Sequence, residues 1–319
     1  MIKKAIGPTI VALMALACII LFFVVGPQFN QTQLGTLLIL GIVCGASILY
    51  CFVVGQISGN NSQMDKLWSI LPAVYAWIIA AKGGMTPRLL IMALLVTLWG
   101  IRLTFNFARK GAYHIKFWSG KEDYRWEILR KGKPLNNKVM WILFNFLFIS
   151  VYQNVLILLT TFPMLAAMSS TIDLNWIDFL AAGLFAFFLL IETIADEQQW
   201  KFQIVKWGML NEGRELKDLP EPYSKGFNTT GLWNYSRHPN YLGEQSIWLS
   251  FYIFSIASGL FFYNWSLFGA LLLVLLFFGS STFGESISKN KYPEYEDYCH
   301  KVSRYVPFRP YIKRSKNED

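Results

Sequence analysis

Long apolar runs alternate with polar loops along the chain, and the runs lack the period-two alternation of membrane β-strands. The segment WSLFGALLLVLLFF, for example, is apolar at almost every position. Runs of this length can cross a hydrocarbon core of about 30 Å as α-helices. The pattern predicts an all-α, polytopic transmembrane helical bundle of about seven to eight spans, over residues 6–25, 34–54, 67–81, 89–107, 139–165, 177–194, 241–262 and 265–284.

The composition agrees with this interpretation. Of the 319 residues, 54% are hydrophobic and only 15% are charged, with a mean hydropathy of +0.36. A soluble domain typically carries about 25% charged residues. We therefore expect an integral, multi-pass membrane protein, in the inner membrane of a bacterial cell or in the endoplasmic reticulum of a eukaryotic one.

The basic residues are unevenly distributed among the loops. The net charge is +9, and Lys and Arg gather in residues 108–138, in residues 195–240 and in the tail, whereas the loops 26–33 and 166–176 have none. Cytoplasmic loops collect Lys and Arg, so both termini are predicted to be cytoplasmic. This topology explains the positive charge by contact with lipid headgroups rather than with nucleic acid.

Cysteines, histidines and common catalytic motifs add little. Cys18, Cys44 and Cys51 lie in apolar runs, where cysteine usually acts as a small packing residue. The three histidines are far apart in the sequence, so we expect no metal site. The chain contains no Walker A, H-E-x-x-H or G-x-S-x-G motif.

Polar side chains inside apolar runs are costly, so each is a candidate for function. Arg102 and Asn106 lie one helical turn apart, which favours a shared inward-facing site, although Arg102 could instead reach the headgroups. Asp65 comes just before a run, where a helix cap or a favourable first-turn charge would also explain it. Glu192 and Asp196 are four residues apart and share a helix face.

A second polar cluster occupies residues 234–248, NYSRHPNYLGEQSIW, at the start of an apolar run. Asn240, Glu244 and Trp248 are spaced by four residues, so a helix places them on one face. A Glu one turn inside a span requires a partner. That partner is either a ligand or Arg237, in which case the pair simply anchors the helix.

Residues 196–248 resemble the C-terminal domain of the steroid 5α-reductase family. In that family an Asp ends one membrane helix, and a polar loop leads to G-G-L-F-x-x-V-S-x-x-N-Y-x-G-E-x-x-x-W. The matching segment here is GLWNYSRHPNYLGEQSIW, with family positions at Gly231, Leu232, Asn240, Tyr241, Gly243, Glu244 and Trp248. The tail YPEYEDYCHKVSRYVPF resembles the family's ending, so the likeness covers roughly the last 125 residues.

The R-H-P-x-Y-x-G core is also similar to that of isoprenylcysteine carboxyl methyltransferases. Those enzymes typically lack the Asn and the Glu at these positions, and their paired tail Glu is reduced here to Glu285. The resemblance therefore implies an NADPH-dependent reductase of a conjugated carbon–carbon double bond in a steroid-like or other lipid. An S-adenosylmethionine-dependent membrane methyltransferase is the alternative. A third interpretation is a cofactor-binding or structural membrane protein that has lost its chemistry together with the phenol of the family's Tyr.

The reductase resemblance also implies roles for individual residues. Asn240, Tyr241 and Glu244 would contact the nicotinamide half of NADPH, and Asp196 would contact the adenosine half. Gln203 replaces a family Arg, for which Lys201 or Lys206 could substitute. The expected cofactor-binding set also includes residues on the phosphate side and in the tail: Arg237, His238, Glu285, Lys289 and Lys291.

The family's reductive groups are a Glu and a Tyr on two early helices, with an Arg three residues after the Tyr. When the comparison is anchored on Arg102, the Tyr position is Trp99 and the carboxylate is Asp65. Hydride addition to an enone leaves negative charge on the carbonyl oxygen, which a donor must stabilise. We therefore expect one membrane domain over residues 1–319, with substrate-side groups in 1–138 and the cofactor-binding half in 139–319.

Overall fold

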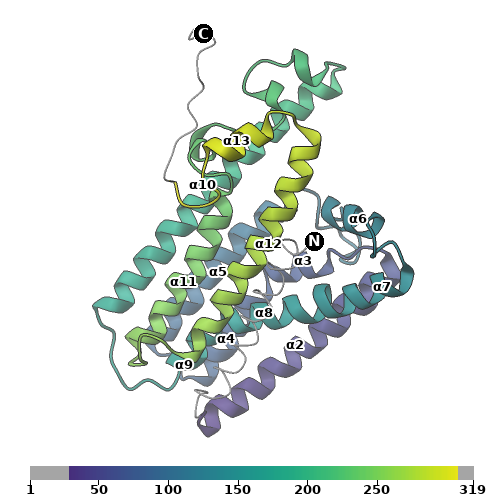
Figure 1. Ribbon diagram of the computed structural model, residues 1–319. Coiled ribbons are helices and arrows are strands. Elements are labelled where there is room, and N and C mark those ends of the chain that lie inside the picture. Colours follow the sequence, from purple (N-terminus) through teal and green to yellow (C-terminus); the bar gives the residue numbers. More distant parts are fainter. Residues whose placement is uncertain (1–28, 308–319) are drawn as a thin grey trace, which may run out of the picture. The chain divides into compact units, whose positions relative to one another are not determined.

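The computed structural model describes residues 29–307, and every regular element in that range is helical (Figure 1). This confirms the predicted all-α class for the described residues, while the span predicted at 6–25 lies outside them. The elements, in chain order, are α2 (Gln31–Ser58), α3 (Gln63–Trp68), α4 (Leu71–Lys82), α5 (Pro87–Ala108), α6 (Tyr124–Lys131), α7 (Lys138–Phe144), the π-helix η1 (Asn145–Tyr152), α8 (Gln153–Thr160), α9 (Phe162–Ala167), α10 (Trp176–Asn211), the 3₁₀ turns η2 (Leu216–Asp218), η3 (Tyr223–Lys225) and η4 (Gly231–Asn234), α11 (Pro239–Ala257), the 3₁₀ turn η5 (Trp265–Leu267), α12 (Phe268–Lys291) and α13 (Tyr295–Lys301).

Five helical stretches in the described residues are long and apolar enough to cross a membrane. Large apolar side chains on them face outward, such as Leu38 and Ile57 on α2, which are 67% and 82% exposed. Such faces are stable in contact with lipid, which agrees with an integral membrane protein. The number of spans and the side of the termini remain predictions. The five stretches are Gln31–Ser58, Pro87–Ala108, Lys138–Ala167, Trp176–Asn211 and Trp265–Lys291.

Two of the predicted spans are shorter in the structure than in the sequence pattern. The run at 67–81 is divided, because α3 ends at Trp68 and α4 begins at Leu71, with Pro72 in its first turn. Proline has no N–H for the preceding turn and disfavours helix in the residue before it. The run at 241–262 corresponds to α11, which ends before Gly259 at φ 98°.

Capping residues define both ends of α2. The side chain of Asn30 accepts a hydrogen bond from the backbone N–H of Gln33, and the Gln33 side chain accepts one from the backbone N–H of Asn30. This reciprocal pair satisfies N–H groups that have no partner inside the helix. At the other end Gly59 takes φ 68°, a conformation that glycine adopts without a Cβ penalty.

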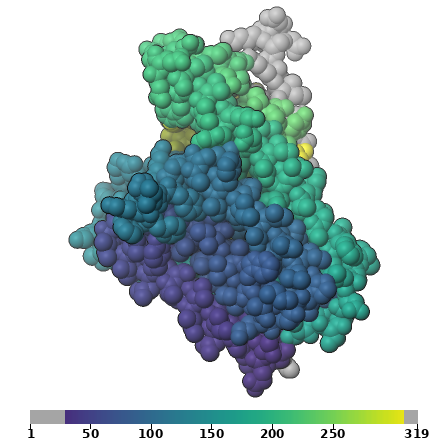
Figure 2. All heavy atoms as spheres, turned by 180° about the vertical axis from the view of Figure 1, so that it is seen from behind, coloured from purple at the N-terminus to yellow at the C-terminus, as the bar shows by residue number. Residues whose placement is uncertain are grey.

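The chain folds as two compact units, each described by itself. Of the described residues, unit 1 comprises 29–183 and Trp248–Leu273. The segments from α2 to α5, coloured purple to blue, form one continuous face in Figure 2. Within this unit, buried Arg88 at the start of α5 pairs with Asp178 at 2.7 Å and also donates to the carbonyls of Ile172 and Asp173. Full pairing is what allows a buried guanidinium to be stable.

Of the described residues, unit 2 comprises Leu184–Ile247 and 274–307. A small aromatic cluster forms part of its core, where Phe227 packs on Tyr295 and Tyr298 from α13. A short backbone pairing attaches the tail to the segment before α11. In it the N–H of Arg237 donates to the Ser303 carbonyl at 2.9 Å, and the next N–H donates to the Arg304 carbonyl at 3.1 Å. The polar segment at 234–248 is therefore held from its N-terminal side.

Candidate functional site

A buried carboxylate, Glu285 of α12, is the centre of a charged cluster in unit 2. Its Oε1 accepts from Arg237 Nε at 2.8 Å and contacts His238 Nε2 at 2.9 Å. Its Oε2 accepts from Arg304 at 3.2 Å. Arg237 also donates to the carbonyls of Cys299 and Val302. Glu285 thus ties three basic side chains together, and Nε and Nη1 of Arg237 are both held by protein groups.

The cluster shifts the pKa values of its members. Burial lowers the pKa of His238 despite the opposing effect of Glu285, so the ring is neutral near pH 7. For Arg237, burial acts to lower the pKa, but the Glu285 carboxylate outweighs it and the pKa is raised. His238 stacks on Tyr241 with ring centroids 5.2 Å apart, and Tyr241 meets Phe277 edge-on at 4.6 Å. Charge and ring stacking together fix the start of α11.

In unit 2 the start of α11 runs against α10 in the antiparallel sense. Asn240 Nδ2 donates to Asp196 Oδ1 at 3.1 Å. One turn further along α11, a Cβ on Gly243 would lie 2.7 Å from the Cβ of Glu192, so only glycine permits this separation of the helices. Glu244, at 3% exposure, is buried on the same helix. The structure therefore brings Asp196 and Asn240, two of the predicted cofactor residues, into direct contact.

The turn η4 completes this part of unit 2. Gly231, at φ 61°, lies so close to Gln198 that a Cβ there would be 2.5 Å from the side-chain amide. The backbone N–H of Leu232 donates to Gln198 Oε1 at 2.9 Å, and the Trp233 indole donates to the Ala195 carbonyl at 3.0 Å. At Gly231 and Leu232 of the sequence motif, the backbone therefore lies close to α10.

Two amide oxygens in this region are buried and accept no hydrogen bond from the described residues. They are Oδ1 of Asn240 and Oε1 of Gln199. A buried acceptor without a donor costs roughly 1–3 kcal/mol. With the carboxylate of Asp196 beside Asn240, the site is rich in acceptors and suits a ligand that brings N–H or O–H donors.

Two lysines in unit 2, both named above as candidate cofactor residues, form a positive site. Lys206 of α10 is 3% exposed and donates to the Gly226 carbonyl at 2.8 Å. Its ammonium lies over the rings of Trp207 and Tyr292 at 5.4 and 5.7 Å, and Lys291 lies over the same two rings at 5.6 and 5.3 Å. Neither lysine forms an ion pair with a carboxylate of residues 29–307. The local pattern at Lys206 gave no sign of burial, because Gly226 lies twenty residues away.

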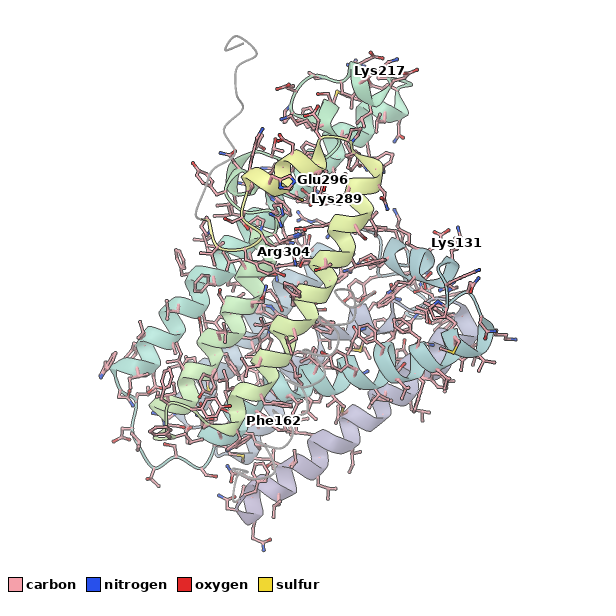
Figure 3. All side chains as sticks on the ribbon, viewed as in Figure 1. Lys131, Phe162, Lys217, Lys289, Glu296 and Arg304 are labelled. Atoms are coloured by element: carbon pink, nitrogen blue, oxygen red, sulfur yellow. The ribbon has the colours of Figure 1, made fainter. Side chains whose placement is uncertain are left out.

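Lys289, predicted for the phosphate side, has a different environment. It lies on the surface of unit 2 and pairs with Glu296 at 3.1 Å (Figure 3). Both side chains are more than one-third exposed. The pair is therefore a solvated surface contact. Among the described residues no group of three or more His, Cys, Asp or Glu side chains could hold a metal ion.

The predicted substrate-side residues lie in unit 1. Asp65 Oδ2 accepts from the Trp126 indole at 3.0 Å. Burial, with Asp123 as a second cause, raises the pKa of Asp65, so this carboxyl holds its proton more readily than usual. Trp99 at 0% exposure packs edge-on against Trp248 at 5.0 Å, and Arg102 is half-buried. Asp65 therefore has the character of a weak acid.

Lys66, next to Asp65, was not singled out from the sequence. It is fully buried, and its ammonium donates to the carbonyls of Phe117 and Ser119 at 2.6 and 2.7 Å. Burial lowers the pKa of Lys66. Because its partners are backbone carbonyls some fifty residues away, no side-chain motif could reveal it.

The described fold is that of an all-helical protein with apolar helices of membrane-spanning length. The chain belongs to the family described as "Protein of unknown function (DUF1295)", which it matches over residues 51–302. It is also 37% identical over 281 residues to "Uncharacterized protein C594.04c" of Schizosaccharomyces pombe, a match that covers 82% of this chain and 78% of the relative. No solved structure matches the chain significantly. The family match includes every candidate site residue from Asp65 to Lys289.

Proposed function

We propose that this protein is a membrane-embedded, NADPH-dependent reductase of a conjugated carbon–carbon double bond in a lipid, of the steroid 5α-reductase type. The observation that carries the proposal is the acceptor-rich contact between α10 and α11 in unit 2. There the Asn240 side chain donates an N–H to Asp196. The buried Oδ1 of Asn240 accepts no hydrogen bond from the described residues. A nicotinamide carboxamide offers an N–H₂ group that such an oxygen can accept.

The charge distribution of unit 2 supports the same cofactor. Lys206 and Lys291 lie together over two aromatic rings and have no carboxylate partner in the described residues. Like charges placed together repel unless an anion lies between them. The phosphates of NADPH supply such an anion, and lysine binds phosphate as a point charge. Lys206 thus fits the role of the family Arg, whose position is occupied here by the uncharged Gln203.

NADPH, when bound, supplies the hydride, and the protein must stabilise the negative charge that develops on the substrate oxygen. Asp65 suits this task, because its raised pKa keeps a proton available for donation. Trp99 occupies the family's Tyr position, and its indole can donate a hydrogen bond without giving up a proton. We therefore assign the proton to Asp65 and not to Trp99.

An S-adenosylmethionine-dependent methyltransferase is the second candidate, favoured by one observation. Glu192 and Glu244 are 5% and 3% exposed, and with Asp196 they place three carboxylates on the facing sides of α10 and α11 in unit 2. Carboxylates attract a sulfonium cation. The lysine pair argues for the reductase, because S-adenosylmethionine carries no phosphate.

Titration of the purified protein in detergent with NADPH, NADH and S-adenosylmethionine distinguishes the two candidates. The proposal expects saturable NADPH binding, with NADH bound more weakly because it lacks one phosphate. Lys206→Gln should weaken NADPH binding roughly tenfold through the loss of one charge-assisted contact. Lys201→Gln is the matched control, since Lys201 lies on the same helix, is exposed and contacts Glu197 at 3.6 Å.

Two further variants separate binding from chemistry. Glu244→Ala should weaken NADPH binding, whereas Asp65→Asn should leave binding unchanged and lower turnover on a panel of lipid enones. Saturable S-adenosylmethionine binding without NADPH binding would overturn the proposal. Equal NADPH affinity in the parent, Lys206→Gln and Glu244→Ala proteins would place the cofactor elsewhere.

A further inference from the structure

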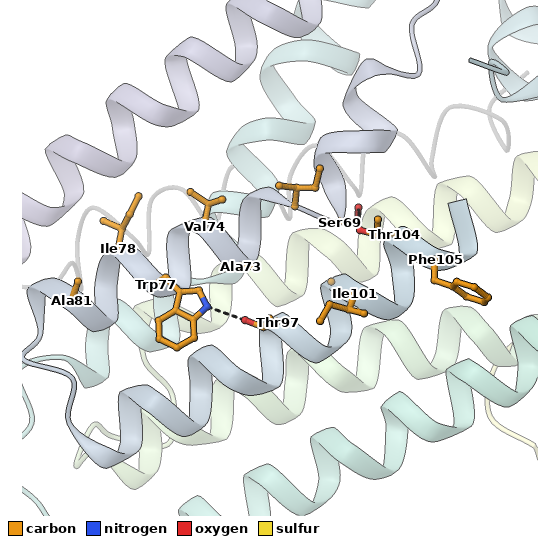
Figure 4. Close-up of a pocket in the computed structure, with 12 residues that line it drawn as sticks. Ser69, Ala73, Val74, Trp77, Ile78, Ala81, Thr97, Ile101, Thr104 and Phe105 are labelled. Atoms are coloured by element: carbon orange, nitrogen blue, oxygen red, sulfur yellow. Dashed lines mark hydrogen bonds between the residues drawn. The ribbon is translucent and has the colours of Figure 1, made fainter. Parts of the chain in front are cut away.

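Unit 1 contains a groove of about 860 Å³ between α4 and α5 (Figure 4). Its twelve lining residues come from Ser69–Ala81 and Thr97–Phe105. The volume lies within the range of about 300–1,000 Å³ that is usual for small-molecule sites. Within α4 the lining runs from Ala73 to Ala81, about 12 Å at 1.5 Å per residue, and Ser69 and Ile70 extend it before the helix begins. The groove is therefore long enough for an extended hydrocarbon chain.

The walls of the groove are apolar and uncharged. Val74, Ile101 and Phe105 line it and are 38%, 61% and 64% exposed. None of the lining residues is Asp, Glu, Lys, Arg or His. A charged head group in such a groove would lose its hydration without gaining a partner. By charge complementarity, the occupant is an uncharged molecule.

One end of the groove is polar, and its hydrogen bonds are directional. Thr104 donates its hydroxyl to Ser69 Oγ at 2.8 Å, and Ser69 in turn donates to the Lys66 carbonyl at 3.1 Å. Ser69 is buried, and its Oγ also lies 3.1 Å from the Tyr113 hydroxyl, so its hydrogen-bonding capacity is used. The Thr104 proton is in use as well, and the remaining capacity of the Thr104 oxygen is to accept. A ligand group at this end must be a donor, as a hydroxyl is; an ester, ether or ketone oxygen cannot donate.

The other polar groups in the groove satisfy one another. The Trp77 indole donates to Thr97 Oγ1 at 3.0 Å, and Thr97 donates to the Ala93 carbonyl at 2.7 Å (Figure 4). The hydrogen-bonding end is therefore the one at Ser69 and Thr104. Close packing closes the floor there, because a Cβ on Gly100 would lie 2.6 Å from the Ser69 carbonyl oxygen.

We propose that the groove between α4 and α5 binds an uncharged long-chain lipid that carries a hydroxyl group. The hydroxyl donates to Thr104, and the hydrocarbon lies along the apolar wall toward Ala81. One wall is α5, which is long and apolar enough to cross a membrane, so the surrounding bilayer can supply such a lipid. The site contains none of Asp65, Trp99 and Arg102, and the inference does not rest on the proposed reduction.

Photocrosslinking tests this site in the full-length protein reconstituted in phosphatidylcholine nanodiscs. The probe is hexadecanol with a diazirine in its chain, and crosslinked peptides are mapped by mass spectrometry. We expect labelling to concentrate on peptides that contain residues 69–105 and to be competed by unlabelled hexadecanol. The methyl ether of hexadecanol and palmitate should compete about tenfold less well or worse, because one lacks the donor and the other is charged.

Each variant that tests the groove is paired with a control variant elsewhere in the protein. Ile101→Trp fills the groove and should remove the labelling, whereas Leu38→Trp, an equally bulky change at an exposed position of α2, should not. Thr104→Val should abolish the preference for hexadecanol over its ether, while Thr193→Val, which removes a hydroxyl bonded only within α10, should keep it. Labelling spread evenly over all apolar helices, or unchanged in Ile101→Trp, would overturn the proposal.

Discussion

The cluster around Glu285 allows a quantitative prediction of stability. In Glu285→Gln the side chain keeps its shape, but it loses its charge and turns an N–H₂ group toward donors. Arg237, His238 and Arg304 then compete for a single carbonyl oxygen. Because Glu285 and Arg237 are only 7% and 9% exposed, water cannot replace the lost carboxylate.

The expected loss follows from burial. Removing one partner of a buried ion pair typically costs about 3–5 kcal/mol, since the other charge is left without compensation. The pair between Lys289 and Glu296 gives the matched control, with side chains 38% and 65% exposed. An exposed pair contributes about 0–1 kcal/mol. Glu285→Gln should therefore destabilise the protein by several kcal/mol more than Glu296→Gln.

The assay is denaturant unfolding of the purified protein in detergent, followed by tryptophan fluorescence, for the parent and both variants. A double variant, Arg237→Met with Glu285→Met, adds a second criterion. An apolar pair of similar size is often close to neutral, so the double variant should be more stable than Glu285→Met alone. Equal, small losses for Glu285→Gln and Glu296→Gln would refute the reasoning, because they would mean that the buried cluster is solvated.

Three further predictions follow from single contacts. The raised pKa of Asp65 means that its contribution to stability is present below the ordinary value of about 3.9 and is lost as pH rises. Asp65→Asn should therefore gain on the parent as pH rises above about 4 in thermal unfolding scans. The lowered pKa of His238 has the opposite effect on stability, because the unfolded chain binds a proton at a higher pH than the folded chain does. The parent should therefore lose stability as pH falls through about 6.5, and His238→Gln should lose less in the same scans. Gly243→Ala should cost about 1–3 kcal/mol in denaturant unfolding, because the new Cβ meets Glu192 at 2.7 Å. Gly208→Ala, with nothing within 4 Å, should instead gain up to about 1 kcal/mol, and equal effects at both glycines would contradict the close approach.

Much of the helical pattern could be predicted from the sequence, because apolar runs of membrane length permit little besides a helix. The division at Ser69 and Ile70 could not be predicted in the same way. Proline at Pro72 marks a possible helix start, but hydropathy continues through it. The π-helix Asn145–Tyr152 is also absent from the pattern, since its residues are apolar enough for any helix type. These details depend on packing between distant segments.

The polar residues, like the helices, could be predicted from the sequence only in part. The four-residue spacing at Asn240 and Glu244 gives a shared helix face from sequence alone. It does not give the partner, and the contact of Asn240 with Asp196 depends on how α10 and α11 pack. The burial of Lys66 and Lys206 has no local signal in the sequence, because backbone carbonyls hold both ammonium groups. A site formed by backbone carbonyls cannot be recognised from a motif of side chains.

The roles expected for Arg237 and His238 can be reconsidered from the charges around Glu285. The resemblance directs both toward phosphates, and in the structure both contact Glu285. These two observations are compatible. Arg237 and Arg304 bring two guanidinium groups to one carboxylate, while burial keeps His238 neutral, so one positive charge remains. Arg304, whose side chain is 26% exposed, is the more accessible of the two guanidinium groups. If an anion binds at this cluster, Arg304→Gln should weaken its binding more than it lowers stability, whereas Arg237→Gln should do the reverse.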